Sequence, residues 1–214
     1  MSLQSFQLKR RSDLHLARKL WHCLGVLFIV GVYTAVSGDT ALRLMAVVTF
    51  ASVMIDVARH QSPKLNHLIV KVFGVVMREH ERETLAGTTY LLLGTFLILW
   101  FFPRPIVTLS LVFLAVADPL ASYVGIRYGK DKLIGSKSLQ GTLAAFAVCT
   151  IITLGYLWYS GLMTERLLMV SLLSGIIGAL AELIPIGKLD DNFTFPVVSA
   201  LGLWGIFTVF GGLI

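Results

Sequence analysis

The chain has 214 residues, of which 56% are hydrophobic and only 14% are charged. Soluble domains carry about 25% charged residues, so this composition, with a mean hydropathy of +0.81, excludes an ordinary soluble domain. The formal net charge of +6 is compatible with nucleic-acid binding. In so apolar a chain, however, the placement of the charges is more informative than their sum, and we expect no nucleic-acid partner.

The apolar residues are gathered in long blocks. These blocks cover residues 20–36, 42–58, 85–102, 105–126, 138–160, 167–186 and 194–214. A helix needs about 20 apolar residues to cross a bilayer, and backbone groups inside lipid must pair within their own segment, which favours helices. The sequence therefore predicts an all-α, polytopic membrane protein with about seven transmembrane helices, folded as a single domain over residues 1–214.

The positive charges indicate the orientation of the chain. If the N-terminus lies inside the cell, the inner segments hold 15 of the 18 Lys and Arg residues, and the outer loops hold only Arg43, Arg104 and Arg166. Cytoplasmic loops of membrane proteins are enriched in Lys and Arg. We therefore predict a cytoplasmic N-terminus and an outside C-terminus, with the first block retained as a span rather than cleaved as a signal peptide.

The longest polar connection, residues 59–84, contains an amphipathic segment. Over residues 63–79 apolar side chains recur at helical spacing, while His67 and Lys71 fall on the other side. This pattern predicts one helix lying in the membrane interface. The charge run REHERE at its end is typical of a solvated face.

An Asp-Pro pair, Asp118-Pro119, interrupts the fourth block about eight residues before its inner end, which corresponds to a depth of roughly 12 Å. A carboxylate at that depth costs at least a few kcal/mol unless it faces a wet cavity or a cation. The residue before a proline is pushed away from helical geometry, and Asp followed by Pro is a common helix start. We therefore predict a break in the span at Asp118. A structural pair with a buried base or a protonated Asp is the alternative to a cation ligand.

The stretch 117–141 that follows combines small and basic residues. On a continuing helix, one stripe from Asp118 would contain Ala121, Gly125, Gly129 and Lys132. Small residues allow a ligand or another backbone to approach closely, and Lys132, Lys137 and Arg127 could meet phosphates at the mouth. We interpret this stretch as a phosphate and metal site at the inner face of the membrane.

The last inner connection, residues 182–196, is acidic, which is unusual in a short inner loop of a basic protein. Its carboxylates are Glu182, Asp190 and Asp191. Mg²⁺ takes one or two protein carboxylates, with phosphate and water oxygens completing its octahedron, so Asp118 with Asp190 or Asp191 could hold it. The chain has no Walker motif, so a P-loop is not supported.

Four motifs occur in a fixed order along the chain. They are RKLWH from Arg18 to His22, REHERETLAGTTYLLLG, the run D-xx-A-xxx-G-xxx-G-xx-K from Asp118 onward, and AELIP…DDNFTFPVVSA. The third motif alone resembles CTP-using membrane lipid transferases in general. The four together resemble the CTP-dependent lipid-alcohol kinases, namely dolichol kinase, phytol kinase and yeast-type diacylglycerol kinase. Relatives often carry Glu-Gly where this chain has Gln140-Gly141, so Gln140 is given no catalytic role.

The resemblance implies a reaction. CTP would be the donor, Mg²⁺ the metal, and a lipid alcohol of the bilayer (a polyprenol or dolichol, phytol, or diacylglycerol) the acceptor of the γ-phosphate at the cytoplasmic face. Such transfers depend mainly on positioning and charge neutralisation.

The resemblance also implies roles for particular residues. Asp118 and Asp191 would bind the metal, with Asp190 as an alternative. The phosphates would be held by Arg18, Lys19, Lys132 and Lys137, and the nucleotide admitted by Gly125 and Gly129. Catalysis would involve Asp118 together with Glu182 or Asp190, either of which could orient or deprotonate the acceptor hydroxyl. We expect Glu81 to stabilise its loop rather than to catalyse, and His22 is as compatible with packing as with ligand binding.

Two other functions fit parts of the pattern. A CTP:phosphatidate cytidylyltransferase would use the same nucleotide pocket, but the lipid phosphate would attack the α-phosphate and release pyrophosphate. A small transporter could use Asp118 and Glu182 to bind a cation, although transported-ion sites usually lie near the midplane of the membrane. The sequence favours the kinase and leaves the alcohol and the oligomeric state open.

Overall fold

The computed structural model describes residues 16–187 and 189–211. The predicted all-α architecture is confirmed, since each predicted apolar block coincides with helix over most of its described length and, among the described residues, strand is confined to one short hairpin. The helices are α1 (Leu16–Ala35), α2 (Gly38–Gln61), α3 (Pro63–Phe73), η1 (Glu79–Arg82), α4 (Gly87–Phe101), α5 (Arg104–Val112), η2 (Phe113–Ala117), α6 (Asp118–Tyr128), α7 (Leu139–Ser160), η3 (Thr164–Arg166), α8 (Leu167–Leu183) and α9 (Asp191–Phe210), and the hairpin strands are β1 (Lys132–Ile134) and β2 (Lys137–Ser138).

Fewer helices of the structure meet the length and hydropathy expected of a membrane span than the seven spans that the sequence predicts. Five helical segments are long and apolar enough to cross a membrane: Gly38–Gln61, Arg104–Tyr128, Leu139–Ser160, Thr164–Leu183 and Asp191–Phe210. By contrast, α4 has only 15 residues, and α1 carries Arg18 and Lys19 in its first turn. The multi-pass character is therefore clear, whereas a count of seven crossings goes beyond these criteria.

Local sequence signals explain where several helices begin. The Ser62 side chain accepts a hydrogen bond from the Leu65 backbone N–H at the start of α3, and Pro63 occupies the first turn, where its missing N–H costs nothing. Ser138 caps α7 in the same way. Asp190 caps α9 through the Asn192 N–H, so the acidic loop has a structural use.

The break predicted at Asp118 is wrong. Segment 104–128 is helical throughout, with Asp118 itself at helical angles of φ −60° and ψ −51°. Pro119 is accommodated by the π-helical turn η2 immediately before it. A wider turn of this kind relieves the clash of the proline ring with the preceding turn, and it keeps the other backbone groups paired inside an apolar segment.

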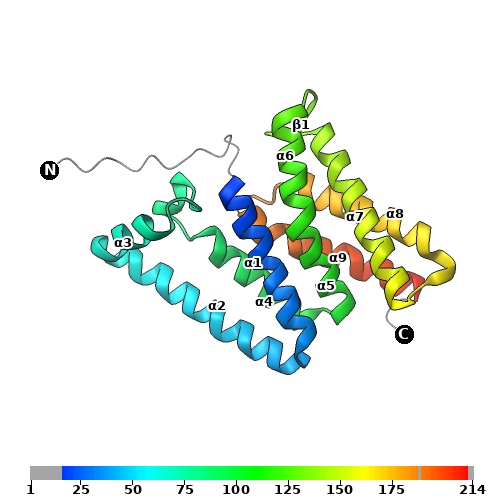
Figure 1. The fold of residues 1–214 in the computed structure, drawn as a ribbon, viewed down its shortest axis with the longest axis horizontal. Coiled ribbons are helices and arrows are strands. Elements are labelled where there is room, and N and C mark those ends of the chain that lie inside the picture. The colour runs from blue at the N-terminus through cyan, green and yellow to red at the C-terminus, as the bar shows by residue number, and fades with distance from the viewer. Residues whose placement is uncertain (1–15, 188, 212–214) are drawn as a thin grey trace.

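The helices pack around η2 and α9. Phe113 and Leu114 of η2 and Phe195 and Leu203 of α9 are fully buried in one apolar core. On one side of this core α7 packs against α8, and on the other α1 and α2 meet at the turn near Ser37 and diverge from it, with α3 at the far end of α2 (Figure 1). The candidate site residues Arg18, Lys19, Glu182 and Asp191 lie at the ends of α1, α8 and α9, whereas Asp118 and Gly125 lie on α6.

Candidate active site

A charged cluster forms where β2, α6, α8 and α9 come together. Lys137 Nζ lies 2.7 Å from Glu182 Oε1 and 3.5 Å from Asp191 Oδ2, and Asp118 acts on the same ammonium group electrostatically. We call Asp118, Lys137, Glu182 and Asp191 the charged cluster. The structure thus brings together four of the predicted site residues from two motifs that are far apart in the sequence.

Lys137 is held as a cation in this cluster. Burial alone would lower its pKa, but the carboxylates of Asp191, Asp118 and Glu182 outweigh burial and raise the pKa above its usual value. Because a raised pKa keeps lysine protonated to higher pH, the ammonium group is charged throughout the neutral range. A fixed positive charge beside several carboxylates suits a site that handles phosphate and metal together.

The small residues of α6 position Lys137. A side-chain Cβ at Gly125 would lie 3.1 Å from Ser138 Oγ, and one at Gly129 only 2.5 Å from it, so Ser138 fills the space beside both glycines. A Cβ at Gly141 would lie 2.8 Å from the Ala121 carbonyl oxygen. The glycines therefore allow the start of α7, and Lys137 with it, to dock closely on α6. Their predicted role in admitting a nucleotide stays a prediction.

The predicted helical stripe from Asp118 to Lys132 does not continue beyond the end of α6. The helix ends at Tyr128, so Lys132 does not continue the face of Asp118 but lies on β1. Its side chain is exposed, and its Nζ donates to the Ser136 carbonyl oxygen at 3.2 Å within the same hairpin. Lys132 and Lys137 thus occupy different environments, although the sequence places them in one basic run.

The carboxyl groups of the cluster leave oxygens available for a cation. Glu182 Oε2 is buried without a hydrogen-bond partner in the described part of the chain, and within residues 16–187 and 189–211 no direct hydrogen bond or ion pair is formed by Asp118. No group of three or more His, Cys, Asp or Glu side chains gathers at metal-binding distance among these residues. The donors fit Mg²⁺, which accepts one or two carboxylates and takes its other ligands from phosphates and water.

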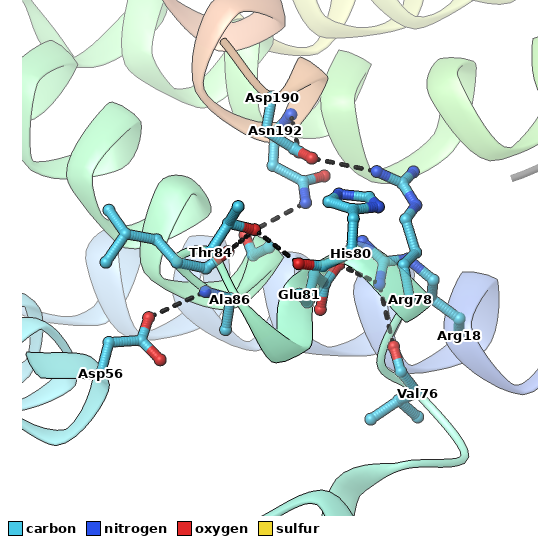
Figure 2. A network of polar contacts seen from close by, with 12 residues as sticks. Arg18, Asp56, Val76, Arg78, His80, Glu81, Thr84, Ala86, Asp190 and Asn192 are labelled. Carbon is cyan, nitrogen blue, oxygen red and sulfur yellow. Dashed lines mark hydrogen bonds and ion pairs between the residues drawn. The ribbon is translucent and has the colours of Figure 1, made fainter. Parts of the chain in front are cut away.

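A second polar network joins Arg18 of α1 to Val76 and Glu81 (Figure 2). Arg18 Nη1 lies 2.7 Å from Glu81 Oε1 and donates to the Val76 carbonyl oxygen at 2.9 Å. The predicted loop-stabilising role of Glu81 is consistent with this ion pair. Arg18 is paired with a carboxylate here rather than open towards a phosphate.

Asp190 and Asp191 have different surroundings. Asp190 uses Oδ1 to cap α9 and Oδ2 to pair with Arg78 at 3.0 Å, whereas Asp191 faces Lys137. Of the two metal candidates, Asp191 is therefore the one that belongs to the charged cluster. The sequence-based prediction assigned no role to Arg78, because the charge run that contains it is typical of a solvated face. No local signal indicates that its partner, Asp190, lies 112 positions away.

The residues after Arg18 in the first motif reach the proline turn. Lys19 Nζ lies 3.4 Å from the Pro119 carbonyl oxygen, and His22 Nε2 donates to the Leu114 carbonyl oxygen at 3.2 Å. In a π turn the Leu114 carbonyl would pair with the N–H five residues later, and Pro119 has none. His22 therefore supplies the partner that the proline lacks, which gives this histidine a structural role.

A large cavity, which no sequence pattern indicated, opens beside the second network. Its volume is about 950 Å³, and α1, α2, α3 and α4 line it mostly with apolar side chains. Arg18, Glu81, Gly87 and Asn192 form part of its polar lining, and Asn192 Nδ2 donates to the Gly87 carbonyl oxygen at 3.1 Å.

Neighbouring residues connect the cavity to the charged cluster. Asn192 lines the cavity while Asp191, one position earlier, belongs to the cluster. Arg18 likewise lines the cavity while the next residue, Lys19, lies beside Pro119 within the electrostatic reach of Asp118. An apolar ligand in the cavity would thus have its polar end close to a site suited to phosphate and metal.

These features define a multi-pass membrane protein with a carboxylate-rich site around a lysine, next to a mostly apolar cavity. The chain belongs to the family of CTP-dependent lipid kinases, as the motifs predicted. It is 34% identical over 160 residues to CTP-dependent diacylglycerol kinase 1 of Schizosaccharomyces pombe, covering 70% of this chain and 73% of that protein. It is 33% identical over 204 residues to the protein of the same name from Eremothecium gossypii, covering 86% of this chain and 64% of that one.

A dolichol kinase is also similar to the chain. The dolichol kinase of Saccharomyces cerevisiae is 29% identical over 209 residues, which are 92% of this chain and 38% of that protein. The chain thus spans less than two thirds of the length of two of these three relatives. No family model matches the chain, and no solved structure matches it.

Proposed function

We propose that the protein transfers the γ-phosphate of CTP to the hydroxyl group of a membrane lipid alcohol. The observation that carries this proposal is the meeting of the charged cluster with the polar side of an apolar cavity. A soluble, highly charged donor and a membrane-embedded acceptor need such a junction, because the two substrates come from different phases.

In this proposal the charged cluster binds the nucleotide and its metal. Asp118 and Asp191 would hold Mg²⁺, which neutralises charge on the phosphates when bound. Lys137 and Lys19 would supply positive charge to the phosphate oxygens, while Lys132 would reach only the outer part of the nucleotide from its exposed hairpin. Phosphoryl transfer needs little covalent help from the protein, so these positioning and electrostatic contributions would provide most of the catalysis.

The same proposal includes seven crossings and a cytoplasmic site. The site residues on α1, α8 and α9 lie at the ends of their helices, and helices that cross the membrane alternately from a cytoplasmic N-terminus would bring these ends to the same side. That side would carry most of the Lys and Arg residues and therefore face the cytoplasm. The helix α3 exposes Leu68, Val72 and Phe73, which suits a position in the interface of the inner leaflet.

Labelled CTP distinguishes this reaction from the alternative one. The purified protein would be supplied with Mg²⁺ and, in turn, with diacylglycerol, phytol, a polyprenol and phosphatidate. A kinase transfers label from γ-labelled CTP to an alcohol and leaves CDP, while α-label stays out of the lipid. Pyrophosphate release with phosphatidate, together with α-label in the lipid product, would overturn the proposal in favour of a cytidylyltransferase.

A further inference from the structure

The cavity between α1, α2, α3 and α4 has the form expected of an amphiphile site. Its volume of about 950 Å³ is near the upper end of the roughly 300–1,000 Å³ found for ligand pockets. The apolar side chains that line it include Phe28 and Val32 of α1, Val48 of α2 and Ile69 of α3. Such a wall offers a long hydrocarbon chain burial but no hydrogen bonds.

Three hydrogen-bonding side chains of the lining meet around one glycine, Gly87. A Cβ at Gly87 would lie 2.7 Å from Arg18 Nη2, 2.8 Å from Asn192 Nδ2 and 3.2 Å from Glu81 Oε1. A side chain at this position would have to displace the ends of these three side chains, so a glycine favours their convergence. The result is a pair of donors next to an ionisable acceptor, which is the complement of a hydroxyl group that both accepts and donates.

Of the two carboxylates in the lining, Asp56 has both oxygens bonded, to Arg59 and to the Ala86 N–H, so Glu81 is the one placed to meet such a hydroxyl. It is only 2% exposed and it lines the cavity. Glu182 and Asp190, the two acids that the sequence suggested for this role, do not line it: Glu182 faces Lys137, and Asp190 is occupied by Arg78 and the start of α9. Asn192 follows Asp191 directly, so a hydroxyl beside Asn192 would lie next to the charged cluster.

We propose that this cavity is the acceptor site of the enzyme, in which the chain of the lipid alcohol lies between α1 and α2 and its hydroxyl is bound by Glu81, Arg18 and Asn192. The proposal rests on the proposed kinase function and assigns the proton acceptor within it. The hydroxyl oxygen forms a bond to the γ-phosphorus, the bond from that phosphorus to the β-bridging oxygen breaks, and CDP leaves. The hydroxyl proton passes to the Glu81 carboxylate and then to solvent.

Two glycines of α1 provide a matched pair of variants that tests the cavity. Gly25 lines it, whereas Gly31 does not, and an added Cβ meets nothing within 4 Å at either position. Gly25→Leu should therefore fill part of the cavity without disturbing the packing, and Gly31→Leu adds the same side chain elsewhere on the helix. The binding readout is cross-linking of a photoreactive long-chain alcohol to the full-length protein, with the labelled peptides identified by mass spectrometry.

We expect the alcohol to label α1, α2, α3 and α4 in the parent protein, and Gly25→Leu to reduce this labelling at least about fivefold, which corresponds to roughly 1 kcal/mol of binding energy. Gly31→Leu should label like the parent protein. Labelling outside these helices, or equal labelling of the two variants, would overturn the acceptor site. Because labelling needs no turnover, a parent protein that is labelled in the cavity but transfers no γ-phosphate would refute the kinase function instead.

Glu81→Gln tests the head-group contact. The amide keeps the size of the side chain and loses the ability to take a proton, so kcat should fall by about 10²–10⁴, the usual contribution of a general base. The KM for CTP and the photolabelling should stay near their parent values, and Glu81→Asp should recover part of the activity. If Glu81→Gln keeps kcat within a few fold of the parent, or loses photolabelling and kcat together, the assignment of Glu81 as proton acceptor is wrong.

Discussion

Replacing Lys137 with methionine probes the charged cluster most directly, because methionine keeps a long unbranched side chain and removes only the ammonium group. The side chains of Lys137 and Glu182 are 20% and 3% exposed, and that of Asp191 is 23% exposed. Removing one partner of a buried ion pair costs about 3–5 kcal/mol, since the remaining charge loses its compensation. Because Lys137 and Asp191 keep some contact with solvent, we expect the lower end of this range, about 3 kcal/mol.

Thermal unfolding in detergent, followed by the fluorescence of the four tryptophans, would measure this loss. At this chain length 1 kcal/mol corresponds to roughly 2–4 °C, so the midpoint should fall by about 6–12 °C. Lys132→Met is the matched control, because Lys132 is exposed and bonds only within its own hairpin, and it should shift the midpoint little.

The cause of the loss can be separated from a simple packing defect. If the unpaired carboxylates destabilise Lys137→Met, then Glu182→Gln added to it should restore part of the midpoint, and Mg²⁺ should stabilise Lys137→Met more than the parent protein. A Lys137→Met protein as stable as Lys132→Met would refute the electrostatic reasoning. So would a double variant less stable than Lys137→Met itself.

Three further outcomes are expected. Asp118→Asn should abolish phosphate transfer at every Mg²⁺ concentration while leaving the protein folded, and near-normal turnover would remove Asp118 from the metal site. Gly178→Ala should cost about 1–3 kcal/mol by overpacking, since its Cβ would lie 2.3 Å from a sulfur atom of α7, whereas Gly155→Ala meets open space and should be neutral or stabilising in the same unfolding assay. Reporters fused at residue 134 and after residue 214 should report inside and outside, respectively, and an inside signal at both would exclude seven crossings.

The helices could be predicted from the sequence because each depends on a local property. A block such as 138–160 is apolar throughout, and the corresponding helix is Leu139–Ser160. The small shift at its start comes from the Ser138 cap, which a hydropathy pattern does not detect. Helices in such blocks are easy to predict, because the backbone groups of a segment inside lipid cannot form hydrogen bonds with water and must pair within the segment.

Two predictions from local sequence rules were wrong: the helix break at Asp118 and the helical stripe that reaches Lys132. Asp118-Pro119 is a good helix start in water, but opening a helix in an apolar segment would leave several backbone groups unpaired. The chain forms a π turn instead and uses His22 to bond the Leu114 carbonyl. The predicted helical stripe ended at Tyr128 because the chain leaves the helix there and forms a hairpin, whose turn uses Gly135 at a φ of +56°.

The candidate site could be predicted as a set of residues but not as an arrangement. The two motifs that were expected to share a site do meet in the structure, since Asp118, Lys137, Glu182 and Asp191 lie together, whereas their phosphate and metal chemistry stays a prediction. Which acid faces which base depends on contacts such as the pair of Arg78 and Asp190, and these are fixed by helix packing rather than by spacing. The cavity is also a product of packing, since it depends on the divergence of α1 from α2.

The balance of charge in the cluster suggests why metal and nucleotide would bind together. Three carboxyl groups, on Asp118, Glu182 and Asp191, face the ammonium group of Lys137, with that of Lys19 nearby. Acids therefore outnumber bases, and a triphosphate without a metal would meet a site of its own sign. A divalent cation reverses this balance, and the phosphates in turn supply the ligands that two carboxylates cannot. Each ligand thus improves the site for the other, and such coupling is reciprocal by thermodynamic necessity. In the proposed enzyme the excess of acids would therefore select the metal-bound nucleotide over the free nucleotide. This selection would take place beside the cavity that binds the lipid alcohol.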